Sequence, residues 1–135
     1  MPDLDHVTLP SEPWEWSMSL PAEVHAATVA RRVLRVLLAS WNIRCILDDV
    51  ELVTSELVTN VVRHGAFPAE LRVQWQDACV RVAVEDAHPM PPRQRDVPTE
   101  AVDGRGLQII DEIARDWGVD RAGGGKVVWA DLLIR

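Results

Sequence analysis

One stretch, residues 51–65, constrains the fold more than any other part of the sequence. Its apolar residues recur at steps of three and four, the spacing of one buried helix face, at Leu52, Val53, Leu57, Val58, Val61 and Val62. Asp48 and Glu51 resemble a capping box that opens this helix. Glu56 and Asn60 stand four residues apart, so the helix would present them one turn apart on one flank. An ordinary amphipathic helix with a polar flank remains the alternative.

Five strands are predicted, the first three from alternating apolar and polar residues. They are expected at residues 14–20, 71–76, 80–85, 117–121 and 127–134. Only Asp77 and Ala78 separate the second strand from the third, so these two strands should form an antiparallel hairpin. The last strand is nearly all apolar, which predicts that it is buried on both faces.

Two more helices are expected, one on each side of the central stretch. The first begins near Pro21, carries an apolar stripe and ends at Asn42 in a left-handed conformation. The central helix ends at Gly65. The third helix opens at Gly104, and its core positions are Leu107, Ile110, Ile113, Ala114 and Trp117.

The order of these elements predicts an α+β fold. Strands joined by tight turns, with helices inserted between them, indicate a two-layer α/β sandwich. Its sheet would be mixed but largely antiparallel, with the helices covering one face. One domain is expected at residues 14–135, preceded by a flexible N-terminal tail at residues 1–13, which is rich in proline and shows no period.

Composition and charge disfavour several classes of protein. The chain has 135 residues and a formal net charge of −7, which argues against binding to nucleic acid. We expect neither a leader peptide nor a membrane span, because no charged-then-apolar start and no sufficiently long apolar run occurs. Cys45 and Cys79 show no CxxC spacing and are interpreted as reduced thiols of a cytoplasmic protein.

Several residues are suited to nucleotide chemistry. The Glu56 carboxylate could orient or deprotonate a hydroxyl, and the Asn60 amide oxygen could bind Mg²⁺. Asp86 ends the third predicted strand, where it could accept a hydrogen bond from an exocyclic amine such as that of adenine. The helix that opens at residues 104–106 could attract phosphate at its N-terminus. Lys126 could neutralise a phosphate.

Each of the last three features also has a plainer interpretation. A strand-terminal aspartate such as Asp86 commonly turns the chain into a loop. Glycines before a helix, as at residues 104–106, can simply form a hinge. Lys126 could be a solvated lysine beside a turn.

Taken in order, four stretches resemble the motifs of the GHKL ATPase superfamily, whose nucleotide-binding domain has the Bergerat fold. The N box of that family is similar to ELVTSELVTNVVRHG, its first glycine box to VAVEDAHPMPP, its second to GRGLQIID, and its last segment to GGGKVVWADL. The resemblance covers nearly the whole chain, residues 14–135. Within the superfamily, the chain resembles the small stand-alone anti-sigma-factor serine/threonine kinases of actinobacterial type.

The resemblance implies a role for each of these positions. Glu56 would be the general base or the carboxylate that orients the nucleophile. Asn60 would be the Mg²⁺ ligand that bridges the phosphates, and Asp86 would hold the adenine amino group. Residues 87–103 would be the ATP lid, and residues 104–106 (Gly104, Arg105 and Gly106) would line the phosphates.

The resemblance also implies cofactors and partners. ATP and Mg²⁺ would be required, and the phosphate acceptor would be a serine or threonine of an anti-anti-sigma partner of the STAS type. The protein would sequester a sigma factor, and a homodimer is among the expected assemblies, because relatives often pair through the sheet or the first helix.

Two departures from the family pattern leave a second hypothesis open. The fuller first glycine box reads DxGxG, but no glycine follows Asp86 closely here. A threonine often follows the lysine of the last segment, where this chain has Val127, so a water-bridged contact to adenine would be lost. The alternative function is a catalytically weak or inactive regulatory module that binds a sigma factor or another partner, with an eroded nucleotide site.

Overall fold

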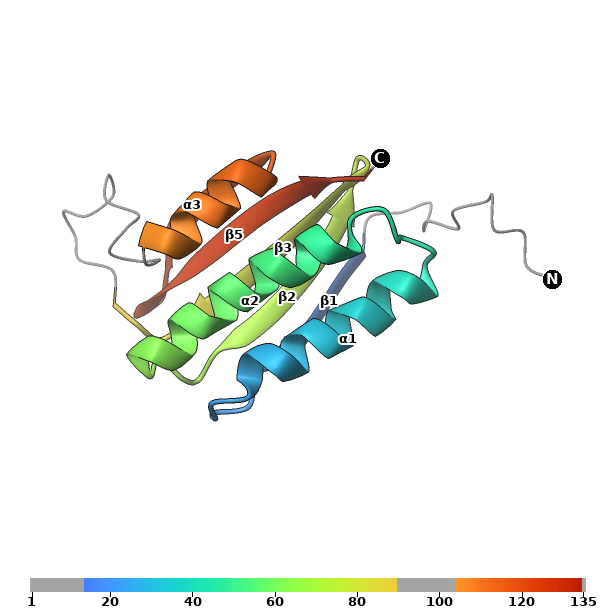
Figure 1. Cartoon of the computed structure of the whole chain (residues 1–135). Coiled ribbons are helices and arrows are strands. Elements are labelled where there is room, and N and C mark those ends of the chain that lie inside the picture. Colours follow the sequence, from blue (N-terminus) through green and yellow to red (C-terminus); the bar gives the residue numbers. More distant parts are fainter. Residues whose placement is uncertain (1–13, 90–103, 135) are drawn as a thin grey trace.

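The computed structural model describes residues 14–89 and 104–134 (Figure 1). Its elements, in chain order, are β1 Trp14–Ser19, α1 Ala26–Ser40, α2 Leu47–His64, β2 Glu70–Gln76, β3 Cys79–Asp86, α3 Gly104–Ile113, β4 Asp116–Ala122 and β5 Gly125–Leu133. The predicted tail at residues 1–13 lies outside the described residues, as does most of the predicted ATP lid, at residues 90–103.

The five strands form one sheet in the order β1-β2-β3-β5-β4. Every neighbouring pair of these strands is antiparallel, so the sheet in the described ranges has no parallel pair. Figure 1 shows α1, α2 and α3 together on one face of this sheet. The predicted α+β fold, a two-layer sandwich with helices over one face, is therefore confirmed, and the sheet is antiparallel where a mixed one was expected.

Three predicted chain reversals are confirmed by the backbone. Asp77 and Ala78 both have positive φ, 54° and 59°, as the two central residues of a type I′ hairpin turn require. They join β2 to β3, where Gln76 pairs with Cys79. Asn42, with φ 58°, follows the end of α1, and Gly65, with φ 59°, caps α2 in the left-handed conformation.

The hydrophobic core lies between the helices and the sheet. On α1 the buried residues are Ala26, Ala30, Leu34 and Leu38. On α2 they recur from Leu47 and Val50 to Val61 at helical spacing, and this face excludes Leu52, which is 42% exposed. The prediction that Leu52 belongs to the buried face is wrong, because it lies two residues from both Val50 and Thr54, on the opposite side of the helix.

The last strand is buried on one face only, which corrects the prediction of burial on both. Along β5, Lys126, Val128, Ala130 and Leu132 are buried. The alternate residues Val127, Trp129 and Asp131 are only partly buried. The described helices cover a single face of the sheet, so the second face of β5 has no layer packed against it.

Two predicted helix starts are wrong. Residues 21–25 form turns, and α1 begins at Ala26, whose N–H donates to the Glu23 carbonyl. The central helix begins at Leu47 without a side-chain cap. The expected capping box does not form, because Ile46 is the N-cap and Asp48 lies inside the first turn, where Arg35 of α1 contacts both acidic residues of the expected box.

The third helix ends earlier than predicted. Its last backbone hydrogen bond joins the Ala114 N–H to the Ile110 carbonyl. The next N–H, of Arg115, donates to the Asp131 carbonyl of β5. The chain thus enters β4, and Trp117 lies in that strand, where it pairs with Ala130, rather than in the helix core.

Candidate functional site

The predicted site residues gather at one end of the molecule. Asp86 is the last residue of β3, and Lys126 is the second residue of β5. Asn60 lies in the C-terminal part of α2, and residues 104–106 form the first turn of α3. Figure 1 shows the ends of α2 and β3 and the beginnings of α3 and β5 together at the left of the view. The fold therefore brings four separate motifs to one place.

Asp86 and Lys126 form a buried ion pair. The two residues are partners across the β3–β5 ladder, and Lys126 Nζ donates to Asp86 Oδ2 over 2.6 Å. Each side chain is only 1% exposed. The other carboxylate oxygen, Oδ1, accepts the backbone N–H of His88 at 2.8 Å. Lys126 is thus not a solvated turn lysine, because its side chain is buried in direct contact with a carboxylate.

The side chain of Val127 does not face Asp86, although its place in the motif suggested a position near the adenine. It faces the open side of the sheet, because side chains alternate along a strand and Lys126 is the one that faces the helices. A threonine at residue 127 would point away from Asp86 for the same reason. Lys126 is therefore the β5 side chain that reaches Asp86.

The close approach of β3 and β5 beside this pair depends on a glycine. A Cβ atom added to Gly125 would overlap the carbonyl oxygen of Asp86 and come within 3.0 Å of the Ala87 Cα. Both obstacles are backbone atoms, which cannot move without shifting β3. Gly125 therefore allows β5 to start close enough to β3 for Lys126 to reach Asp86.

This close approach makes a testable prediction. We expect Gly125→Ala to lower the free energy of unfolding by about 1–3 kcal/mol, because the added methyl group forces the two strands apart. Gly124→Ala is the matched control: a Cβ there meets nothing within 4 Å, and we expect a change within about 0.5 kcal/mol. Urea denaturation of the two variants measures the difference. Equal stabilities would show that β5 can start farther from β3.

Glu56 and Asn60 lie on α2 as predicted, one turn apart. Asn60 is buried, with 4% of its surface exposed, and Glu56 is partly exposed. Within residues 14–89 and 104–134, Glu56 forms no hydrogen bond or ion pair with another side chain. Its carboxylate is thus available to accept a proton, whereas Glu51 on the same helix is already bound by Arg35.

Two histidines lie beside the ion pair. The rings of His64, at the end of α2, and His88, just after β3, meet edge to face with centroids 4.9 Å apart. Burial lowers the pKa of His88, and the positive charge of Lys126 lowers it further, against the opposing effect of Asp86. The His88 imidazole is therefore neutral near pH 7. The sequence carries no signal for this contact, because the two residues come from different elements.

The residues fit a Mg²⁺ ion held through phosphates. Across the described part of the chain, no three His, Cys, Asp or Glu side chains gather as a metal site. Mg²⁺ commonly takes only one or two oxygens from the protein and the rest from phosphates and water. The amide oxygen of Asn60, which is buried on α2, would serve as such a ligand. In the same ranges, no helix has both the length and the apolar character to cross a bilayer.

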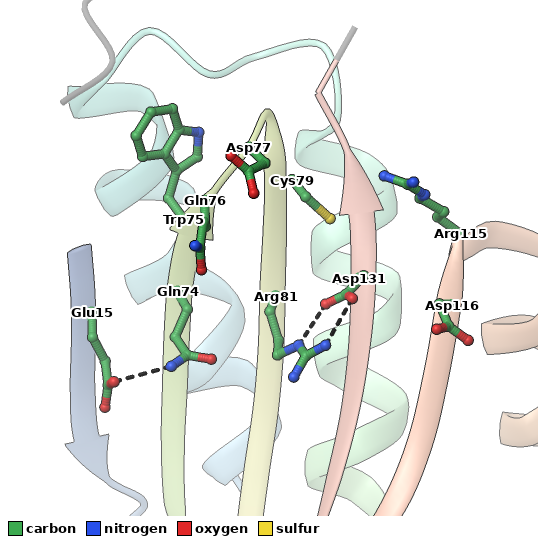
Figure 2. Close-up of a pocket in the computed structure, with 10 residues that line it drawn as sticks. All are labelled: Glu15, Gln74, Trp75, Gln76, Asp77, Cys79, Arg81, Arg115, Asp116 and Asp131. Atoms are coloured by element: carbon green, nitrogen blue, oxygen red, sulfur yellow. Dashed lines mark hydrogen bonds and ion pairs between the residues drawn. The ribbon is translucent and has the colours of Figure 1, made fainter. Parts of the chain in front are cut away.

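Two hollows differ in their relation to these residues. One of about 580 Å³ lies at the end of the sheet beside Ala87 and the glycines at residues 123–125, but it opens on the face of Arg72 and Glu85, opposite the buried side chains of Asp86 and Lys126. The other, of about 610 Å³, lies on the open face of the sheet (Figure 2). Two of its charged groups pair with each other: Arg81 forms two hydrogen bonds to Asp131, at 2.6 and 2.9 Å. Within the described residues, neither hollow opens onto the side chains of Asp86 and Lys126.

Comparisons with known proteins place these features in a family. A family model of the histidine kinase-like ATPase domain matches residues 20–132. No curated protein matches. A crystal structure of the RsbU and RsbW domains of Rv1364c from Mycobacterium tuberculosis matches 93% of the chain, with a TM-score of 0.70 and 22% identity. That likeness shows the fold, and the chain spans only 33% of that longer protein chain.

A second solved structure is similar over a shorter range. It is the histidine kinase domain of the blue-light activated histidine kinase EL346 from Erythrobacter litoralis. It matches 65% of this chain and 44% of its own, with a TM-score of 0.50 and 29% identity. What the two structures have in common with this chain is the layered fold.

Proposed function

This chain belongs to the histidine kinase-like ATPase (GHKL) family, and on that premise we propose that it is an ATP- and Mg²⁺-dependent serine/threonine kinase that also acts as an anti-sigma factor. The observation that supports this function best is the convergence of Asn60, the Asp86–Lys126 pair and the start of α3 at one end of the fold. The fold-level likeness to a structure that contains an RsbW domain agrees with the anti-sigma branch that the motifs resemble.

In this proposal each residue acts on one part of the nucleotide. Asp86 accepts a hydrogen bond from the adenine amino group, and Asn60 supplies an oxygen to Mg²⁺, which neutralises charge on the phosphates when bound. The first turn of α3, at residues 104–106, offers backbone N–H groups that have no partner within the helix and therefore suit phosphate oxygens. Residues 14–135 then form one ATP-binding domain.

Glu56 carries the proton transfer. It takes the proton of a serine or threonine hydroxyl on an anti-anti-sigma partner of the STAS type, as that oxygen bonds to the γ-phosphorus. The bond from this phosphorus to the bridging oxygen breaks, and ADP leaves. Phosphoryl transfer depends mainly on positioning and charge stabilisation, which a small domain can supply. We place this reaction in the cytoplasm, with a sigma factor as the second partner and a homodimer as the assembly.

A specific observation favours a second candidate, a regulatory binding module. Both oxygens of Asp86 are already engaged within the chain, by Lys126 and by the His88 N–H. The residues that follow, Ala87, His88 and Pro89, include no glycine to relieve the backbone. A purine must share Asp86 with these groups. If no purine binds there, the chain would bind its protein partner without a nucleotide.

Calorimetry separates the two candidates. We expect the full chain to bind Mg-ATP saturably, and Asn60→Ala to weaken that binding about tenfold, or 1.4 kcal/mol, because the metal loses its protein oxygen. Thr59→Ala, one residue earlier and off this flank, is the matched control and should bind as the wild type does. Removing Mg²⁺ with a chelator should erase the difference between the variants. No heat at high micromolar protein would favour the binding module.

A further inference from the structure

The stability of the fold does not require an ion pair at the positions of Asp86 and Lys126. A buried ion pair stabilises a protein no more than a well-packed apolar pair of the same size. Both side chains are 1% exposed and lie on the buried face of the sheet, at the end of β3 and the start of β5. What an ion pair offers here, and an apolar pair would not, is hydrogen bonds to a ligand.

The pair still has hydrogen-bonding capacity for a ligand. A carboxylate offers about four lone-pair positions. Within the described residues, Asp86 uses one on Lys126 and one on the His88 N–H. A lysine ammonium has three N–H donors, and Asp86 accepts one of them. An acceptor and a donor, 2.6 Å apart, thus stand side by side.

Adenine presents the complementary pair on one edge. Its 6-amino group is a donor, and the neighbouring ring nitrogen N1 is an acceptor. Guanine presents the reverse order, an acceptor oxygen at position 6 and a donor N1–H. A carboxylate next to an ammonium therefore matches adenine with one hydrogen bond for each group.

We infer that Lys126 is a specificity-determining residue of the adenine site, which donates to N1 of the base while Asp86 accepts from the 6-amino group. The inference rests on the proposed function and deepens it. It also replaces the phosphate role predicted for Lys126. The base and the phosphates of ATP lie on opposite sides of the ribose, so an ammonium in direct contact with Asp86 is beside the base.

An analogue that lacks only the N1 acceptor tests this assignment. In 1-deaza-ATP a C–H group replaces N1. We expect the full chain to bind Mg-1-deaza-ATP roughly ten- to a hundredfold more weakly than Mg-ATP, because the ammonium loses a charge-assisted hydrogen bond. Calorimetry or displacement of a fluorescent nucleotide measures the ratio of the two affinities. Mg-GTP should bind more weakly than Mg-ATP in the same assay.

Two variants test whether the ratio of the affinities for ATP and 1-deaza-ATP depends on Lys126. In Lys126→Met, ATP and 1-deaza-ATP should bind within about twofold of each other, since no donor faces N1. Arg121→Met is the matched control: Arg121 is the exposed cation opposite Lys126 on β4, and its removal should leave the ratio unchanged. If Lys126→Met does not fold, the ratio measured on the wild-type chain decides alone.

The possible failures are distinguishable. Equal affinity of the wild-type chain for ATP and 1-deaza-ATP overturns the assignment of Lys126 and leaves the kinase proposal standing. A wild-type ratio that persists in Lys126→Met overturns it too. If the wild-type chain binds inorganic tripolyphosphate and Lys126→Met does not, Lys126 contacts the phosphates and the assignment to the base is overturned. The absence of binding to any adenine nucleotide overturns both the assignment and the proposed function.

Discussion

Glu56→Gln is expected to lower the rate of phosphotransfer by about 10²–10⁴-fold, the usual contribution of a general base, while Mg-ATP binds as before. Glutamine keeps the size of the side chain but cannot take a proton from the acceptor hydroxyl. Glu56 is partly exposed on α2, and within residues 14–89 and 104–134 it forms no ion pair, so the substitution should leave the fold intact. Single-turnover transfer from radiolabelled ATP to a STAS-domain acceptor measures the rate.

Glu51→Gln is the matched control for this experiment. Glu51 lies on the same helix and is bound by Arg35, away from the flank that Glu56 shares with Asn60. Its substitution should leave phosphotransfer within about twofold, since it removes only a surface ion pair. Transfer by Glu56→Gln at the wild-type rate would remove Glu56 from the role of base, and equal losses in both variants would point to a general effect on α2.

Asp86→Asn and Lys126→Met are each expected to lower the free energy of unfolding by about 3–5 kcal/mol. Either change leaves the partner as a buried charge without its counter-ion, because both side chains are 1% exposed. The double variant should be more stable than either single variant, since it leaves neither charge behind. Urea denaturation of the four proteins gives the coupling energy directly.

A half-exposed ion pair on the opposite face provides the comparison. Arg72 binds Glu85, the neighbour of Asp86, over 2.6 Å, but the two side chains are 34% and 37% exposed. Arg72→Met should therefore change stability by no more than about 1 kcal/mol. If Lys126→Met costs as little as Arg72→Met, water reaches the Asp86–Lys126 pair in solution, and the buried arrangement is wrong.

Features with a local signal were predicted from the sequence. The helix around Glu56 and Asn60 follows from a period of three and four, which depends only on neighbouring residues. The hairpin follows from a two-residue turn at Asp77 and Ala78, and the end of α2 from Gly65. These local signals, taken in order, were enough to indicate the α+β fold.

Features that depend on distant partners were not predicted. Lys126 was expected at a phosphate or in solvent, because its contact with Asp86 is set by the register of β3 against β5, which no local pattern encodes. The capping box failed because α2 begins at Leu47, which places Asp48 inside the helix, and because Arg35 of α1 binds Glu51. Burial of β5 on both faces was inferred from its composition, which cannot reveal that the described helices cover one face only.

The interior position of β5 in the sheet has a consequence for synthesis. The chain emerges from the ribosome in order, so Asp86 is made well before the strand that carries its counter-ion. Until β5 inserts between β3 and β4, the nascent domain lacks the counter-ion of the carboxylate that we propose binds the base. In the proposed site, recognition of the base therefore waits until that interior strand docks.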